Sequence, residues 1–170
     1  LILKNDHFKL PDGRTYTLLT DTPTGNSVFI IDVLSSTALP VEKNYAELLQ
    51  IANLMHDESR QQKFNHSTHF SSKARLAVQA RNWKIIEPLT TNPLIYIQGD
   101  RWRIISERAS KMQCSPKTIL LNLRRYWQGG QTQVALLGNY ANCGRAGELE
   151  KGARGKPSKK PGASNFRMTP

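Results

Sequence analysis

A helix with well-marked ends lies between residues 115 and 130, and it limits the possible folds more than any other segment of the sequence. Ser115 followed by Pro116 is a favoured pairing at a helix start, and Gly129-Gly130 is the usual signal for a helix end. Apolar residues recur between these ends at helical spacing and predict the buried face: Ile119, Leu123 and Tyr126 or Trp127. A helix of this kind needs other elements to pack against.

Two more helices are predicted upstream. The first covers about 72–87 and ends at Pro88, and the second covers about 100–112 with Asp100 as its N-cap. The expected buried faces consist of Leu76, Ala80, Trp83 and Ile86 in the first helix and Trp102, Ile105, Ala109 and Met112 in the second. Pro93–Gln98 is compatible with a short extra turn between the two helices.

The last two predicted helices are joined by a tight turn, Gln113-Cys114. Three helices with this spacing predict a helix-turn-helix domain over residues 71–138. Ala109 stands where the two helices approach closely, whereas Gln113 occupies a turn position that is often Gly. The alternative is a three-helix bundle that binds no ligand.

Residues 1–62 are predicted to form a small β-rich domain. Runs rich in β-branched and aromatic residues alternate with turn-forming residues, and these runs are 7–10, 15–20 and 27–33. Val28–Ile31 is almost continuously apolar, which predicts a strand covered on both faces. Apolar residues over about 42–59 then recur at helical spacing. We expect a β meander, or part of a small barrel, that is completed by this helix.

The predicted fold class is therefore α+β. A linker at residues 63–70 joins the β-rich domain to the helix-turn-helix domain, and residues 139–170 form a basic extended tail rich in Gly, Pro and Lys. The tail is either a passive linker or an arm that follows DNA toward a further domain. Because the first residue is Leu1, and because Met168-Thr169-Pro170 is typical of a helix start, we expect the chain to be a piece of a longer protein.

Charge is distributed unevenly along the chain. The 170 residues carry a formal net charge of +11, but residues 1–70 hold 6 Lys and Arg against 8 Asp and Glu. Residues 71–170 hold 18 against 5. A near-neutral module followed by a strongly basic one predicts a polyanion as partner. The alternative is a basic surface that serves solubility alone.

Several other classes of protein are disfavoured. No apolar run approaches the roughly 20 residues of a membrane span, and the opening residues do not form a signal peptide. Cys114 and Cys143 cannot build a disulfide framework and fit a reducing cytoplasm. His56, His66 and His69 have no Cys or carboxylate at ligand spacing, so we expect no metal site.

The exposed face of the helix over residues 115–128 is the predicted DNA-binding site, because no acidic residue occurs between Lys117 and Gly144. Side chains at the start of such a helix contact bases in the major groove, and later cations contact phosphates. We expect base contacts from Ser115, Lys117, Thr118 and Leu121, with Asn122 at the border of this group. Phosphate contacts are expected from Arg124, Arg125, Lys111, Arg101 and Arg103, and Gln128 belongs to the same face. In the tail, the expected contacts are Arg145, Lys151, Arg154, Lys156, Lys159 and Lys160.

A resemblance to a known family supports this interpretation. The core is Leu123-Arg-Arg-Tyr-Trp-Gln128, followed by Gly130-Gln-Thr132, Ala135-Leu136, Tyr140 and the turn from Gly144 to Gly147. In this order, over about 35 residues, the segment resembles the TnsB-type transposases of heteromeric and CRISPR-associated bacterial transposons.

The resemblance implies that the module ending at Gln128 is the first domain to bind transposon ends, with a second such domain beginning near Thr169. It also implies that an RNase H-like domain with a DDE carboxylate triad and Mg²⁺ lies beyond Pro170. We therefore expect no catalytic residue and no cofactor in this chain. The implied partners are double-stranded DNA with repeated sites, other transposase protomers and an ATPase regulator. The implied location is the bacterial cytoplasm.

Two other functions stay open at this point. One is a helix-turn-helix transcription regulator whose N-terminal module senses a ligand or dimerises. The other is a structural or protein-interaction module whose basic half is incidental. The role of residues 1–70 is also open. Three alternative partners for them are DNA, the next protomer and the ATPase regulator, and the sequence does not distinguish between these.

Overall fold

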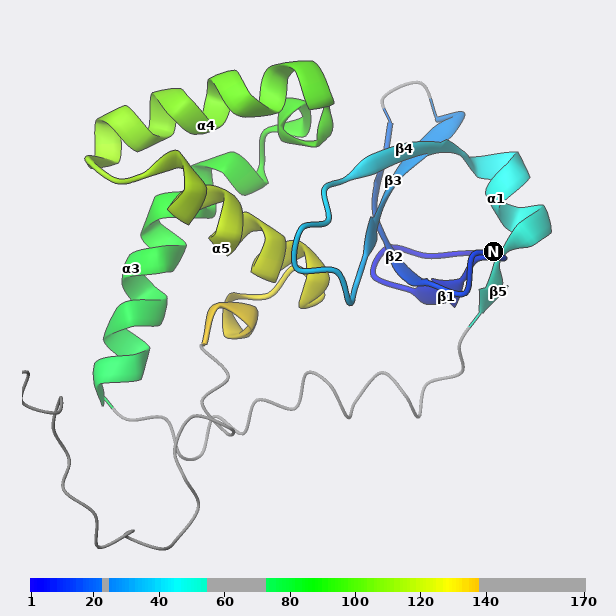
Figure 1. Ribbon diagram of the computed structural model, residues 1–170, viewed down its shortest axis with the longest axis horizontal. Helices are drawn as coiled ribbons and strands as arrows, with labels where there is room; N and C mark the ends of the chain where they lie inside the picture. Colours follow the sequence, from blue (N-terminus) through cyan, green and yellow to red (C-terminus); the bar gives the residue numbers. More distant parts are fainter. Residues whose placement is uncertain (23–24, 55–72, 138–170) are drawn as a thin grey trace, which may run out of the picture. The chain divides into compact units, whose positions relative to one another are not determined.

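The computed structural model describes residues 1–22, 25–54 and 73–137, and it confirms an α+β fold. The strands are β1 (His7–Lys9), β2 (Thr15–Asp21), β3 (Ser27–Asp32), β4 (Val41–Asn44) and β5 (Asn53–Leu54). The α-helices are α1 (Tyr45–Ile51), α3 (Lys73–Thr90), α4 (Gln98–Met112) and α5 (Pro116–Gln128), and the 3-10 helices are η2 (Pro93–Tyr96) and η3 (Gln133–Leu136). Figure 1 shows the order of these elements.

The five strands form one antiparallel sheet in the order β4-β3-β2-β1-β5. Its central strands are buried on both faces, as the run Val28–Ile31 predicts. One face carries Leu18, Val28 and Ile30, which pack with Phe8 and with Leu48 of α1. The opposite face carries Leu19, Phe29 and Ile31, which pack against the helices. Because successive side chains of a strand point to opposite faces, the central strands contribute to two hydrophobic clusters.

The helix expected over 42–59 is shorter than predicted. Residues 41–44 pair with β3 as strand β4, and α1 begins only at Tyr45. Asn44 caps it, because its Oδ1 accepts hydrogen bonds from the backbone N–H groups of Ala46 at 2.9 Å and Glu47 at 3.2 Å. The pairing with β3 overrides the helical spacing of the apolar residues.

Pro88 does not end the first predicted helix, since α3 continues to Thr90. A proline at this position cannot donate to the carbonyl of Lys84, four residues earlier. The guanidinium of Arg108 supplies the missing donor, because Nη2 donates to that carbonyl at 2.8 Å, and its Nε also donates to the carbonyl of Ile85 at 2.9 Å. A side chain of α4 therefore allows α3 to pass through its proline.

The buried faces of the first two helices agree with the prediction only in part, at Ile86, Ile105 and Ala109. In α3 the buried residues are Asn82, Ile85, Ile86 and Leu89, whereas Leu76 is 45% exposed. In α4 they are Arg101, Ile104, Ile105 and Ala109, whereas Trp102 is 54% exposed. Asp100 is not the N-cap of α4, because the helix begins at Gln98 after Ile97. The extra turn within Pro93–Gln98 is present as η2.

Both ends of α5 are as predicted. Ser115 is the N-cap, and its Oγ accepts a hydrogen bond from the backbone N–H of Lys117 at 3.3 Å. Gly129 is the C-cap, and Gly130 adopts a positive φ of 72°. A Cβ at residue 129 would collide with the side chain of Ala135 in η3. The first glycine is therefore required by close packing and the second by backbone conformation.

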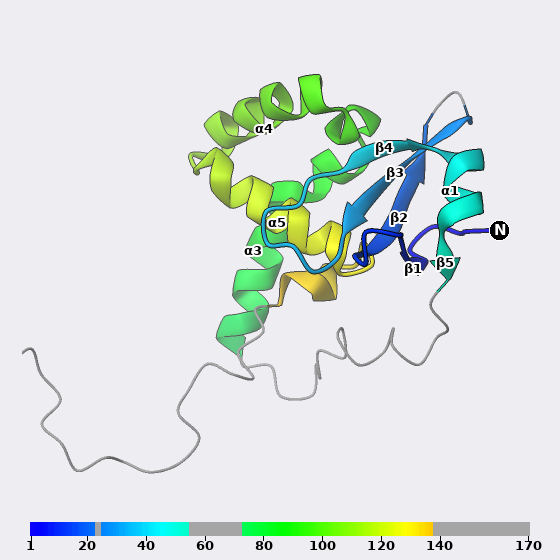
Figure 2. The same ribbon diagram turned by 45° about the vertical axis from the view of Figure 1, so that its right-hand side comes forward.

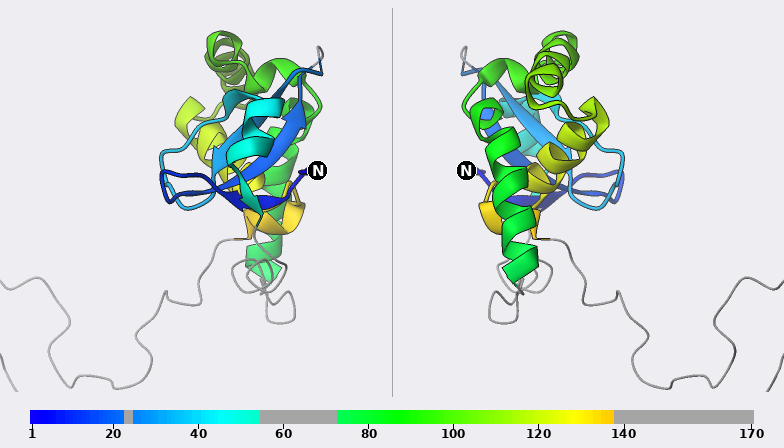
Figure 3. Two further views of the ribbon diagram at one scale, coloured as in Figure 1. Left: turned by 90° about the vertical axis from the view of Figure 1, so that its right-hand side faces the viewer. Right: turned by 90° about the vertical axis from the view of Figure 1, so that its left-hand side faces the viewer.

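One hydrophobic cluster joins the sheet to the helices. Leu19, Phe29 and Ile31 belong to the same buried cluster as the core residues of α3, α4, α5 and η3. Aromatic contacts continue across the junction: the ring centroids of Phe29 and Tyr96 are 5.6 Å apart, and those of Tyr96 and Trp127 are 5.9 Å apart. Figure 3 shows α3 and η3 side by side, where Gln79 Nε2 donates to the carbonyl of Gln133 at 2.8 Å. The predicted linker (63–70) and tail (139–170) lie outside the described residues.

Candidate nucleic-acid interface

Helix α5 and its N-cap residue present an exposed face, which we call the α5 face. It consists of Ser115, Lys117, Thr118, Leu121 and Arg125. These positions share one side of the helix because Ile119, Leu123, Tyr126 and Trp127 occupy the buried side. Leu121 is 42% exposed, which places an apolar side chain between two cations. Five of the predicted DNA-binding residues are thus brought together in solvent.

Two neighbours bound this face. On one side, Tyr126 contacts Trp83 of α3 with ring centroids 5.7 Å apart. On the other side lies the segment that connects β3 to β4, residues 33–40, which we call the β3–β4 loop. Figures 1 and 2 both show this loop running beside α5. The α5 face is therefore a strip between a helix and a loop.

The β3–β4 loop engages two residues that the sequence assigns to DNA. Arg124 Nε donates to the carbonyl of Ala38 at 2.8 Å. Gln128 Nε2 donates to the carbonyls of Asp32 and Ser35, each at 2.7 Å. Both side chains thus have contacts within the protein, through Nε of Arg124 and Nε2 of Gln128, and both residues are half-buried, so their DNA contacts stay a prediction. Burial also lowers the pKa of Arg124.

Arg101 requires a correction, because only 5% of this residue is exposed. Its guanidinium donates to three backbone carbonyls, those of Pro40 at 3.1 Å, Ile95 at 3.0 Å and Tyr96 at 2.6 Å. Burial lowers the pKa of its guanidinium. Carbonyl dipoles replace water around this cation, which ties α4 to η2 and to the β3–β4 loop and leaves the guanidinium no access to phosphate.

Asn122 is a second correction. Only 2% of this residue is exposed, so its amide cannot contact a base edge in this structure. Its Nδ2 atom has no hydrogen-bond partner among the described residues. Helical spacing places residue 122 one turn after Thr118, but the packing of α5 turns it toward the interior.

The remaining predicted cations are exposed on α4. Arg103 lies in ion pairs with Asp100 at 2.9 Å and Glu107 at 3.3 Å, and the hydrogen bond that it donates to Asp100 is the first cause of its raised pKa. Lys111, in the last turn of α4, is exposed. Both residues line a groove of about 290 Å³ between α4 and the end of α3. Both residues therefore lie on α4, outside the α5 face.

The described helical region carries a strong excess of positive charge. Residues 73–137 contain eleven Lys and Arg but only three acidic residues, Glu87, Asp100 and Glu107. Two of these three pair with Arg103 on α4. Helix α5 contains no carboxylate, so the α5 face attracts anions with no local competitor on its own helix.

Several other predictions fall outside the described residues, namely the tail contacts Arg145, Lys151, Arg154, Lys156, Lys159 and Lys160 and the histidines His56, His66 and His69. In the part of the chain that is described, no group of three or more His, Cys, Asp or Glu side chains gathers where a metal ion would bind. No described helix is long and apolar enough to cross a membrane.

The β3–β4 loop is the element that sequence reasoning missed. Its contacts with α5 span 86 positions between Ala38 and Arg124 and 96 between Asp32 and Gln128. The only local hint is its composition, because residues 33–41 carry no charge between Asp32 and Glu42.

Comparison with known proteins adds an independent finding. Residues 79–140 match the family model described as the TnsB second domain. The matched segment contains α4, α5 and η3, together with most of α3. None of the curated proteins matches the chain significantly.

Proposed function

We propose that this chain, whose residues 79–140 match the TnsB second domain, is the N-terminal region of a TnsB-type transposase and binds the ends of a transposon through the α5 face. The observation that carries the proposal is the α5 face itself, a solvent-exposed strip with two cations and no carboxylate on its helix. Transposase-related DNA binding is what the family implies, and the exposed cations of the strip support the proposal that DNA binds there.

In this proposal α4, the turn at Gln113-Cys114 and α5 act as a helix-turn-helix, with the N-terminal half of α5 in the major groove. Lys117 then donates to guanine O6 and N7, and Leu121 packs against a thymine methyl group. Ser115 and Thr118 have hydroxyls that bond to either base edges or phosphates. Base identity would be determined by these four side chains.

Phosphate contacts come from the exposed cations that flank this strip. Arg125 lies on the α5 face itself, and Lys111 precedes the turn into α5. Arg103 joins them when its exposed ion pairs exchange for phosphate, because such pairs contribute little in water. The basic tail supplies further backbone contacts from Arg145, Lys151, Arg154, Lys156, Lys159 and Lys160.

The chain's part in transposition is then binding and positioning of DNA in the bacterial cytoplasm. Cleavage and strand transfer belong to the DDE domain with its Mg²⁺, which the resemblance implies elsewhere in the parent protein. Other transposase protomers and an ATPase regulator are the partners that the same resemblance implies. No residue of this chain is assigned a catalytic role.

The experiment is a selection followed by a titration. The 170-residue chain is used to select duplexes from a randomised library, and the selected duplex is compared with a scrambled one by fluorescence anisotropy at several salt concentrations. We expect a preference of about 10³ or more for the selected duplex. Equal binding to both duplexes, with a steep salt slope on each, would reduce the function to contact with the DNA backbone.

The selected sequence also separates a transposase from a transcription regulator. The proposal expects repeated copies of it at the two ends of the mobile element that encodes the chain. Copies confined to promoters would instead support the regulator.

A further inference from the structure

The β3–β4 loop contacts α5 through its backbone carbonyls. Several of its side chains are therefore free to contact a ligand. Carbonyls of Asp32, Ser35 and Ala38 accept the hydrogen bonds from Arg124 and Gln128. The side chains of Leu34, Ser36 and Thr37 are exposed. The loop therefore presents two hydroxyl groups beside the C-terminal end of the α5 face: that of Ser36, and that of Thr37, whose Oγ1 lies 3.3 Å from Ser35 Oγ.

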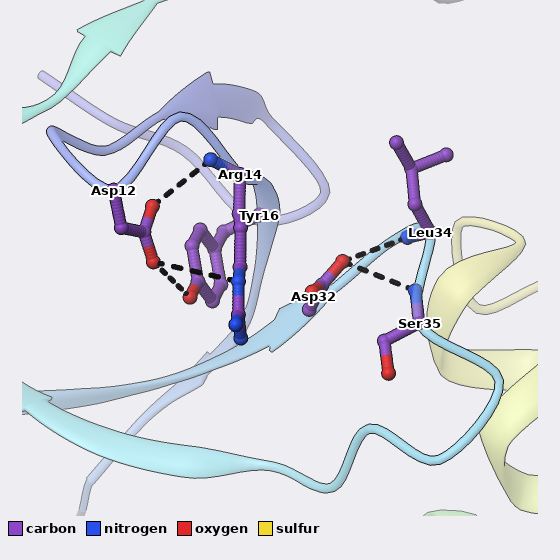
Figure 4. A network of polar contacts seen from close by, with 6 residues as sticks. All are labelled: Asp12, Arg14, Tyr16, Asp32, Leu34 and Ser35. Carbon is purple, nitrogen blue, oxygen red and sulfur yellow. Dashed lines mark hydrogen bonds and ion pairs between the residues drawn. The ribbon is translucent and has the colours of Figure 1, made fainter.

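Hydrogen bonds within the loop hold this arrangement. Asp32 Oδ1 accepts from the backbone N–H of Leu34 at 2.8 Å and of Ser35 at 3.2 Å, as Figure 4 shows. Ser35 Oγ in turn accepts from the backbone N–H of Thr37 at 3.3 Å. A loop that is ordered before binding avoids part of the entropy cost of contact with a ligand.

The charge around the loop favours an anionic neighbour. Residues 33–40 carry no charge, and the guanidiniums of Arg101 and Arg124 donate to the carbonyls of Pro40 and Ala38. The carboxylate of Asp32, at the start of the loop, is engaged with the two backbone N–H groups described above. Hydroxyl groups beside the half-buried guanidinium of Arg124 are suited to phosphate oxygens, which Ser and Thr side chains commonly contact in protein–DNA complexes.

We propose that the β3–β4 loop is a second DNA-contacting element, which places Ser36 and Thr37 against the phosphate backbone that borders the groove occupied by α5. This inference rests on the proposed function, and it gives the N-terminal module a direct part in DNA binding. Specificity still belongs to α5, whereas the loop adds affinity and fixes the orientation of the helix in the groove.

Opposite charges introduced at Ser36 provide the test. Ser36 is exposed, and no hydrogen bond of its side chain is present among the described contacts, so Ser36→Lys and Ser36→Glu leave the fold intact. The matched controls are Gln50→Lys and Gln50→Glu, on the exposed surface of α1, which lies on the opposite side of the sheet from α5 in Figures 1 and 2. All four variants of the full chain are titrated on the selected duplex at about 0.1 M salt, where charges separated by more than ~10 Å are screened.

We expect Ser36→Lys to tighten DNA binding by about fivefold and Ser36→Glu to weaken it by a similar factor, whereas each Gln50 variant changes affinity less than about twofold. The gain in Ser36→Lys cannot come from unfolding, which only weakens binding. Equal effects at positions 36 and 50 would overturn the inference.

A further pair of variants separates this inference from the proposed function. Lys117→Glu and Arg125→Glu, on the α5 face, must weaken binding if α5 contacts DNA at all. If they do and the Ser36 variants match the Gln50 variants, only the loop is wrong. If the α5 variants also bind as tightly as the original chain, the proposed function fails.

Discussion

Arg124 donates from Nε to the carbonyl oxygen of Ala38 over 2.8 Å, although 86 positions separate the two residues in the sequence. Its neighbour Arg125 points into solvent on the α5 face. Two adjacent arginines of the same helix therefore have different tasks: the first attaches the helix to the β-rich module, and the second is available to a ligand.

Substitution of each arginine by methionine separates these tasks. Arg124→Met should lower the free energy of unfolding by about 1 kcal/mol, because the carbonyl of Ala38 loses its donor, and should leave the salt slope of DNA binding nearly unchanged. Arg125→Met should leave stability within about 0.5 kcal/mol and reduce the salt slope by about 1. Urea unfolding and anisotropy titrations measure the two quantities. Identical behaviour of the two variants would contradict the distinction.

Gln113 and Gln131 both have a left-handed backbone conformation, with φ values of 50° and 56°. Glycine suits this conformation better than any other residue, so Gln113→Gly should raise the free energy of unfolding by about 0.5–1 kcal/mol. Gln131→Gly should bring no such gain, because Gln131 Nε2 donates to Asn5 Oδ1 at 3.2 Å and to the carbonyl of Leu19 at 2.8 Å. Chemical unfolding of both variants checks this, and an equal gain would show that the contacts of Gln131 contribute nothing.

Gly129 and Gly130 should respond differently to alanine. Gly129→Ala should cost about 2–3 kcal/mol, since the new methyl group collides with Ala135 and with the backbone of α5. Gly130→Ala should cost about 1 kcal/mol, which is the strain of a positive φ of 72° in open space. The free energies of unfolding decide the order, and a larger loss at residue 130 would contradict the packing of η3 on α5.

Stability at high pH should depend on Tyr96. Burial and the neighbouring Tyr126 raise the pKa of Tyr96 from 10.0 to about 12. Because the pKa of Tyr96 is raised in the folded state, this residue contributes to the free energy of unfolding. That contribution is complete below pH 10 and is lost as the pH rises from 10 to 12. Over that interval the chain should lose about 2 kcal/mol more than Tyr96→Phe does, as measured by urea unfolding at each pH. Parallel pH profiles for the two proteins would show that Tyr96 does not bind its proton more tightly in the folded state.

The sequence predicts the elements whose determinants are local. Ser115, Pro116 and Gly129 determine the ends of α5 through capping chemistry between near neighbours. The run Val28–Ile31 similarly predicts a strand with two buried faces. In each case the residues that decide the structure lie within one turn or one strand of each other.

The features that the sequence does not predict depend on distant partners. Apolar periodicity selects Trp102 for the core of α4, but the buried residue is its neighbour Arg101, because carbonyls of Pro40, Ile95 and Tyr96 satisfy the guanidinium. Pro88 is accommodated within α3 by Arg108, twenty residues later. No local pattern encodes such pairings, and for the same reason the sequence does not predict the contact of Arg124 with the β3–β4 loop.

Occupation of the major groove by α5 is the central claim, and methylation interference on the selected duplex tests it most directly. Dimethyl sulfate modifies guanine at N7 in the major groove and adenine at N3 in the minor groove. We expect N7 methylation of guanines within the selected site to block binding of the original chain, and the block at one guanine to disappear for Lys117→Ala. Interference from adenine N3 alone, unchanged by Lys117→Ala, would contradict the account.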